Sequence, residues 1–110
     1  MAEIQLLKSV TTVLEDGSGT SPPLGPSSFG ETWQLSGVSL QCSTNVAEAT
    51  GAVYLNGALI GTTTWASTGD TGVATSLVQV MTGQVITATW TGGDAGATAT
   101  MTVLGTRTVP

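Results

Sequence analysis

Seven carboxylates and one cysteine are the side chains of this sequence whose types most readily do chemistry. General acid–base catalysis needs two titratable groups that converge on one cleft. Almost all of the acids lie in predicted turns or at strand ends, where such side chains are usually solvated or hydrogen-bond to their own backbone. We therefore expect no catalytic carboxylate pair and no enzyme. The acids are Glu3, Glu15, Asp16, Glu31, Glu48, Asp70 and Asp94.

Cys42 is the single cysteine, and the chain contains no histidine that could activate it as a nucleophile. It continues the apolar phase of its segment, so we expect a small core residue. A lone cysteine forms no intrachain disulfide. Asp70 and Asp94 could hold calcium together with carbonyl oxygens, but the acids lack the clustered spacing of an EF-hand loop. The sequence predicts neither a metal nor a cofactor.

The charge balance argues against two classes of partner. The net charge is −5, from seven acids against Lys8 and Arg107, and charged residues make up only 8% of the chain. Binding to nucleic acid needs clustered Lys and Arg, and an anionic membrane surface attracts the same residues. The first residues include an acid where a signal peptide is basic, and no apolar run approaches the roughly 20 residues that span a bilayer. We expect a soluble protein that folds in a reducing cytoplasm and binds neither nucleic acid nor a membrane.

The three tryptophans differ in their setting. Trp33 and Trp90 fall within alternating segments and are expected to be buried, whereas Trp65 lies at a loop boundary beside three threonines and is expected to be more exposed. Trp65 could be a platform for a sugar ring or a contact with another subunit. An aromatic anchor with small, adaptable neighbours is typical of an interface. The candidate partner-binding residues are Trp65, Ser67, Thr68 and Asp70.

The stretch 77–104 sets the fold class. Apolar and polar residues alternate through 84–91 and again through 97–104, with β-branched residues on both faces, and a period of two is typical of strands. A glycine-rich loop, 92–96, separates the two runs and supplies the positive φ that a hairpin needs.

Strands are also expected at 3–15, 32–42, 52–56 and 58–64. Gly37 shifts the alternation of the second of these by one residue, as a β-bulge does, and Asn56-Gly57 is a strong hairpin signal. The prolines in 20–26 predict an edge strand or a loop. Loops are expected at 43–50 and 65–72, and a tail at 105–110. The chain is thus predicted to be one domain, 1–110, an antiparallel β-sandwich of about eight short strands, with jelly-roll or immunoglobulin-like topology left open.

Three motifs in 25–106 carry a family resemblance. They are G-P…G-E-x-W at 25–33, V-Y-L-x-G at 53–57, and G-Q-x-I-x-x-x-W-x-G-G…G-A at 83–97. In this order they resemble small β-sandwich structural proteins of the virions of actinobacterial tailed bacteriophages. The motifs mark a fold, and the family has no catalytic residues to carry over.

The resemblance implies a capsid decoration (minor capsid) protein on the outer surface of the head shell. It would be made in the host cytoplasm, be present in many copies as a homo-oligomer, and bind the major capsid protein or other virion proteins. A minor tail or collar protein is the alternative within this class. From another class, the chain could be a carbohydrate-binding adhesion module that uses Trp65 and Tyr54.

Overall fold

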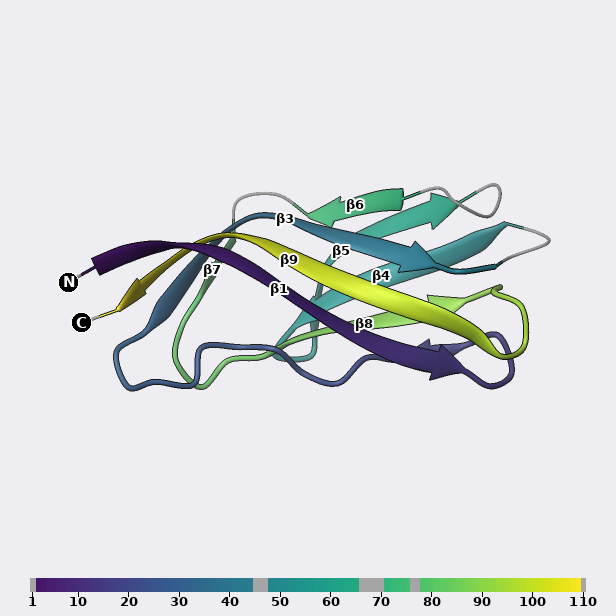
Figure 1. Cartoon of the computed structure of the whole chain (residues 1–110), viewed down its shortest axis with the longest axis horizontal. Coiled ribbons are helices and arrows are strands. Elements are labelled where there is room, and N and C mark those ends of the chain that lie inside the picture. The colour runs from purple at the N-terminus through teal and green to yellow at the C-terminus, as the bar shows by residue number, and fades with distance from the viewer. Residues whose placement is uncertain (1, 45–47, 66–70, 76–77, 110) are drawn as a thin grey trace.

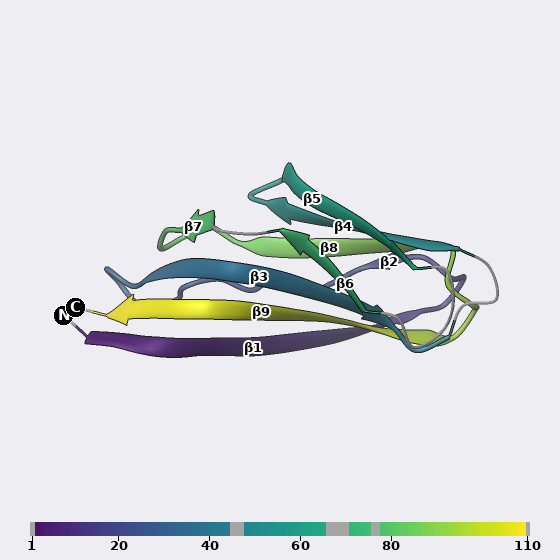
Figure 2. The same ribbon diagram turned by 90° about the horizontal axis from the view of Figure 1, so that it is seen from above.

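The computed structural model describes residues 2–44, 48–65, 71–75 and 78–109, and every regular element in these ranges is a β-strand. Two antiparallel sheets face each other, so the predicted all-β sandwich is confirmed (Figure 1 and Figure 2). These ranges contain no helix long and apolar enough to cross a bilayer. The strands are β1 (Ala2–Leu14), β2 (Gly19–Thr20), β3 (Thr32–Cys42), β4 (Ala49–Leu55), β5 (Ala58–Trp65), β6 (Thr71–Thr75), β7 (Val78–Val80), β8 (Ile86–Thr91) and β9 (Ala97–Val109).

The strand order identifies the topology. One sheet has the order β1-β9-β3-β6, with β7 also paired to β3, and the other has the order β2-β8-β4-β5. Because β6 and β7 pair with successive parts of β3, they form one edge strand in two pieces. Eight strands then remain, whose connections cross between the sheets except at the β4–β5 hairpin. This order is that of a jelly roll, which decides between the two topologies left open above.

The longest ladder joins the two ends of the described chain. β1 and β9 each have 13 residues and pair without a register shift, from Ala2 opposite Val109 to Leu14 opposite Ala97. β9 also pairs with β3 as far as Thr108, so it is a central strand along most of its length. The expected tail at 105–110 is therefore wrong, because residues up to Val109 complete a ladder with β1.

The core lies between the sheets and follows the predicted alternation. Trp33 and Trp90 are each 1% exposed, which confirms that both are buried. Cys42 is buried, as predicted, and Leu6 and Leu14 place one face of β1 against the core. The other large buried side chains are Leu35, Val38, Leu40, Val53, Val80, Ile86, Met101 and Val103.

Two local irregularities were predicted, and both are present. Leu35 lies opposite Gly105 and Gly37 opposite Leu104, so Ser36 is the extra residue of a bulge in β3. Asn56 and Gly57 have φ angles of 52° and 87°, and two positive φ angles are what a type I′ hairpin turn needs.

The proline segment lies along one edge of the second sheet. The amide of Ser21 donates to the carbonyl of Ala88 at 2.8 Å, and Leu24 forms an isolated bridge with Ile86. Between them, Pro22 has no amide hydrogen to donate to a ladder. The prediction of an edge strand or loop for 20–26 is confirmed.

Candidate functional site

The residues predicted to bind a partner fall mostly outside the described structure. Ser67, Thr68 and Asp70 lie outside the described residues, and of Trp65 only the backbone, at the end of β5, lies within them. Their role and the exposure of the Trp65 side chain remain predictions. In the described ranges, no group of three or more His, Cys, Asp or Glu residues could hold a metal ion.

Glu31 differs from the solvated turn acid that the sequence predicts. Its side chain is only 5% exposed. The Trp33 indole Nε1 donates to Glu31 Oε2 at 2.9 Å, and Arg107 Nη1 lies 3.6 Å from the same oxygen. The amide of Ser28 donates to Glu31 Oε1 at 3.4 Å. The expectation was wrong for Glu31 because two groups compensate the burial of its charge: the Trp33 indole and the Arg107 guanidinium, which is far away only in the sequence.

These contacts keep the Glu31 carboxylate charged. The bond from the Trp33 indole lowers the pKa of Glu31 most, and the Ser28 amide and the Arg107 charge lower it further, against the opposing effect of burial. A charged acceptor strengthens the hydrogen bonds that it receives. Glu31 therefore acts as a fixed acceptor that ties β3 to the turn preceding it.

That turn holds a fully exposed aromatic ring. The amide of Glu31 donates to the carbonyl of Ser28 at 3.0 Å, which makes Phe29 and Gly30 the central residues of a β-turn. Gly30 has φ 80°, as the third residue of a type II turn requires. The Thr82 hydroxyl donates to the carbonyls of both Ser28 and Glu31. The backbone of the turn is thus fixed, while the side chain of Phe29 is 96% exposed.

Two neighbouring loops add further exposed apolar side chains. Met81 and Val85, 47% and 37% exposed, belong to the β7–β8 loop that contains Thr82. The hairpin that carries Leu59, 58% exposed, is tied to this loop through Asn56, whose Oδ1 accepts from the Val85 amide at 3.1 Å. We call Phe29, Leu59, Met81 and Val85 the apolar tip.

The apolar tip comes from the β2–β3 loop, the β7–β8 loop and the start of β5, and the hydrogen bonds above join these segments. Figure 1 shows the β2–β3 and β7–β8 loops toward the end of the sandwich where the two labelled chain ends lie. Interface centres are enriched in aromatic residues and Met and depleted of charge. Phe29 and Met81 are of the enriched types, and all four side chains are uncharged. The sequence signal was the turn around Gly30, but the pattern did not indicate that Phe29 points away from the core.

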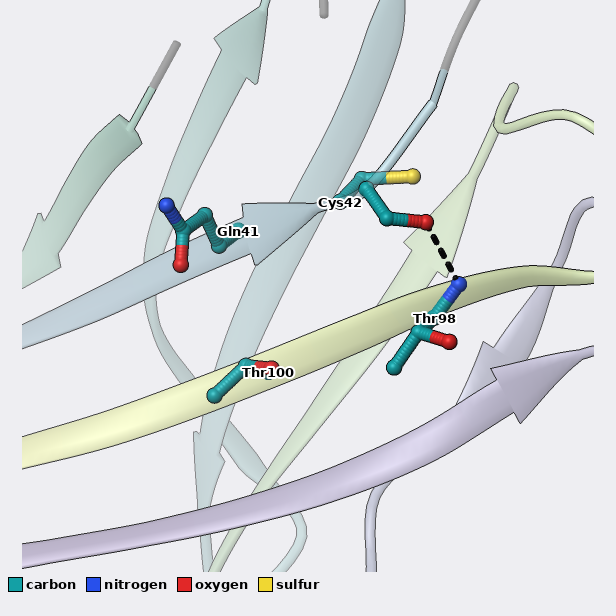
Figure 3. Close-up of a pocket in the computed structure, with 5 residues that line it drawn as sticks. Gln41, Cys42, Thr98 and Thr100 are labelled. Atoms are coloured by element: carbon teal, nitrogen blue, oxygen red, sulfur yellow. Dashed lines mark hydrogen bonds between the residues drawn. The ribbon is translucent and has the colours of Figure 1, made fainter. Parts of the chain in front are cut away.

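A separate hollow lies at the other end of β3 and β9. It has a volume of about 280 Å³ and is lined by Gln41, Cys42, Ser43, Thr98 and Thr100. The Thr98 amide donates to the Ser43 hydroxyl at 2.8 Å, the dashed line of Figure 3. Its lining offers hydroxyl and amide groups but no charged side chain, and the Cys42 thiol donates to the carbonyl of Thr44 at 3.2 Å. The hollow thus has no pair of groups for acid–base work.

Comparisons with known proteins assign no family. No protein-family model and no curated protein matches the sequence. A chain from the structure of infectious bursal disease virus Gt strain matches with a TM-score of 0.34 and 15% sequence identity. The match covers 94% of this chain but 32% of that one, so the sequence spans about a third of its length. At this TM-score the likeness carries no argument about fold or function.

Proposed function

We propose that the chain is a non-catalytic structural protein of a phage virion, a capsid decoration protein that binds the outer surface of the head shell through its apolar tip. The motifs that resemble phage virion proteins support the setting. Jelly rolls occur in viral capsid and lectin domains, but a fold does not by itself determine a function. The observation that carries the proposal is Phe29, a 96% exposed ring on a turn fixed by its own hydrogen bonds.

A rigid turn that exposes an aromatic ring is suited to binding another protein. Exposed Phe leaves unfavourable apolar surface in water, and a partner that buries it recovers about 1.5–3 kcal/mol. Because the turn is already ordered, binding costs little further conformational entropy. On a symmetric shell the same modest contact is repeated many times, which suits many copies of a small protein.

The tip should bind with little dependence on salt. Its four side chains are uncharged, and Glu31, the last residue of the turn that holds Phe29, is paired with Arg107. Salt screens attraction between exposed charges and leaves apolar contacts largely intact. We therefore expect similar affinity for the shell at low and at high ionic strength.

The test is binding of purified protein to undecorated capsids, isolated tails and cell-wall polysaccharide. Phe29→Ser should weaken binding to capsids by about 10- to 100-fold, because it removes the burial of one ring. Val13→Ser is the matched control, since Val13 is 58% exposed but lies at the far end of β1. The control should bind as the parent does.

Other outcomes would assign other functions. Saturable binding to tails alone would replace the proposal by the minor tail or collar protein. Retention on polysaccharide that is lost with Trp65→Ala or Tyr54→Ala, with no binding to capsids, would replace it by the carbohydrate-binding module. Equal binding of Phe29→Ser and the parent to capsids would refute the role of the tip.

A further inference from the structure

β1 is a long edge strand with little of the usual protection. In the part of the chain that the structure describes, β1 pairs only with β9, so its other side presents unpaired amide and carbonyl groups. Figure 2 shows β1 at the margin of its sheet. Natural edges are blunted by prolines, bulges or several charges. β1 has no proline, keeps one register over 13 residues, and carries only Glu3 and Lys8 as charges.

The outer face of this edge contains one row in which both paired residues are apolar. Leu7 lies directly opposite Leu104, and the two are 62% and 38% exposed. The next rows are paired hydroxyls: Ser9 and Thr102 are 3.2 Å apart at their oxygens, and Thr11 and Thr100 are 3.4 Å apart. The row formed by Leu104 and Leu7, the leucine row, thus runs to the open edge of the sheet and ends there.

We infer that β1 pairs antiparallel with β1 of a second copy of this chain, about a twofold axis at Leu7. In such a pair, the numbers of any two residues that lie opposite each other add up to the same value. That sum must be even, because side chains alternate between faces and opposite side chains lie on the same face. An axis at Leu7 makes that sum 14. Residues 2–12 then pair along the edge, and the outer face gains a continuous row of Leu104, Leu7, and the Leu7 and Leu104 of the second copy.

Charge favours this register over those with the axis at Lys8 or at Ser9, and the leucine pair favours it over an axis at Leu6, which would place Leu7 opposite Gln5. An axis at Lys8 would place Lys8 opposite itself, and an axis at Ser9 would place Glu3 opposite Glu15. Like charges directly opposite each other destabilise a sheet. With the axis at Leu7, Lys8 faces Leu6 and Glu3 faces Thr11, so no like charges are opposed.

This inference goes beyond the proposed function, because the edge and the apolar tip are different surfaces. A twofold axis perpendicular to the sheet would point the two tips toward opposite ends of the dimer. Since each copy has a net charge of −5, added salt should strengthen the dimer by screening the repulsion between copies.

The register is tested by cross-linking the full chain through Leu7→Cys, in a background where the native Cys42 is buried. Opposite residues lie about 5 Å apart at Cβ, so a short thiol cross-linker should give a covalent dimer. Ser9→Cys is the control. In this register its two copies lie four residues apart, about 13 Å, and the short reagent should not join them.

Sedimentation gives the second readout. We expect the parent to dimerise. Leu7→Lys should weaken the dimer about tenfold or more, because it removes the leucine row and places two cations opposite each other. Val13→Lys, which lies outside the paired residues 2–12, should leave the dimer unchanged. Circular dichroism checks that each variant is folded. A parent that is monomeric up to its solubility limit, or Ser9→Cys that cross-links as well as Leu7→Cys, would overturn the inference. Protection of β1 amides from hydrogen exchange only after a shell protein is added would also overturn it, in favour of a strand from that protein.

Discussion

Replacing Trp33 by Phe is expected to destabilise the protein more than replacing Trp90 by Phe, although both indoles are 1% exposed. Both changes remove a similar volume from the core. Trp33→Phe also removes the 2.9 Å bond to the buried carboxylate of Glu31, and a hydrogen bond to a charged group contributes about 1.5–3 kcal/mol. The Trp90 N–H has no hydrogen-bond partner among the residues that the structure describes. The free energies of unfolding of the two variants should therefore differ by at least about 1.5–3 kcal/mol.

The loss in Trp33→Phe should depend on pH. The pKa of Glu31 lies below its ordinary value of 4.5 in the folded protein, chiefly because of the Trp33 indole. A group with a lowered folded pKa stabilises the protein above its unfolded pKa, and this stability is lost as the pH falls through the folded pKa. The gap in stability between the parent and Trp33→Phe should be complete at neutral pH and should shrink as the pH falls below 4.5.

Urea unfolding followed by circular dichroism measures both effects at a series of pH values. Equal m-values for the parent and the two variants would confirm that the comparison concerns stability and not the compactness of either state. Equal losses for Trp33→Phe and Trp90→Phe at neutral pH would refute the role assigned to Glu31. A gap that stays constant into acid would refute it independently.

The remaining predictions concern the backbone and the second sheet edge. Gly105→Ala should cost about 2–3 kcal/mol, because a Cβ there would collide with the carbonyl oxygen of Gln34. Gly57→Ala, where φ is also positive but the space around a Cβ is open, should cost only about 1 kcal/mol, and urea unfolding compares the two. Replacing the three prolines of 22–26 by Thr should increase self-association in sedimentation, since the edge would regain its donors. Variants as monodisperse as the parent would contradict the last prediction.

The sequence predicts those parts of the fold in which a local pattern determines the outcome. Asn56-Gly57 determines a hairpin through its φ preferences, and the phase shift at Gly37 marks a bulge, whatever the rest of the chain does. The continuation of β9 could not be predicted in this way. Thr106 and Thr108 lack the large apolar partners of a core strand, and they are ordered by pairing with β1, whose residues lie about 100 positions away in the sequence.

The candidate site depends on similar long-range contacts. Glu31 directly precedes β3 and lies two residues before Trp33, and that spacing was an available signal for their bond. The ion pair between Glu31 and Arg107 had no such signal in the sequence, because it depends on the β3–β9 register. The exposure of Phe29 follows from a turn that is fixed by Thr82, a residue of a loop far away in the sequence. The residues next to Phe29 in the sequence therefore could not show whether its ring lies on the surface or in the core.

The central claim, that the chain decorates a capsid shell, is tested most directly by counting its copies in purified phage particles. Quantitative mass spectrometry against the major capsid protein gives that number. We predict a fixed number that matches the symmetry of the shell and that falls when Phe29→Ser replaces the parent but not when Val13→Ser does. A few copies per particle that remain with the tail when heads and tails are separated, or no copies at all, would contradict the claim.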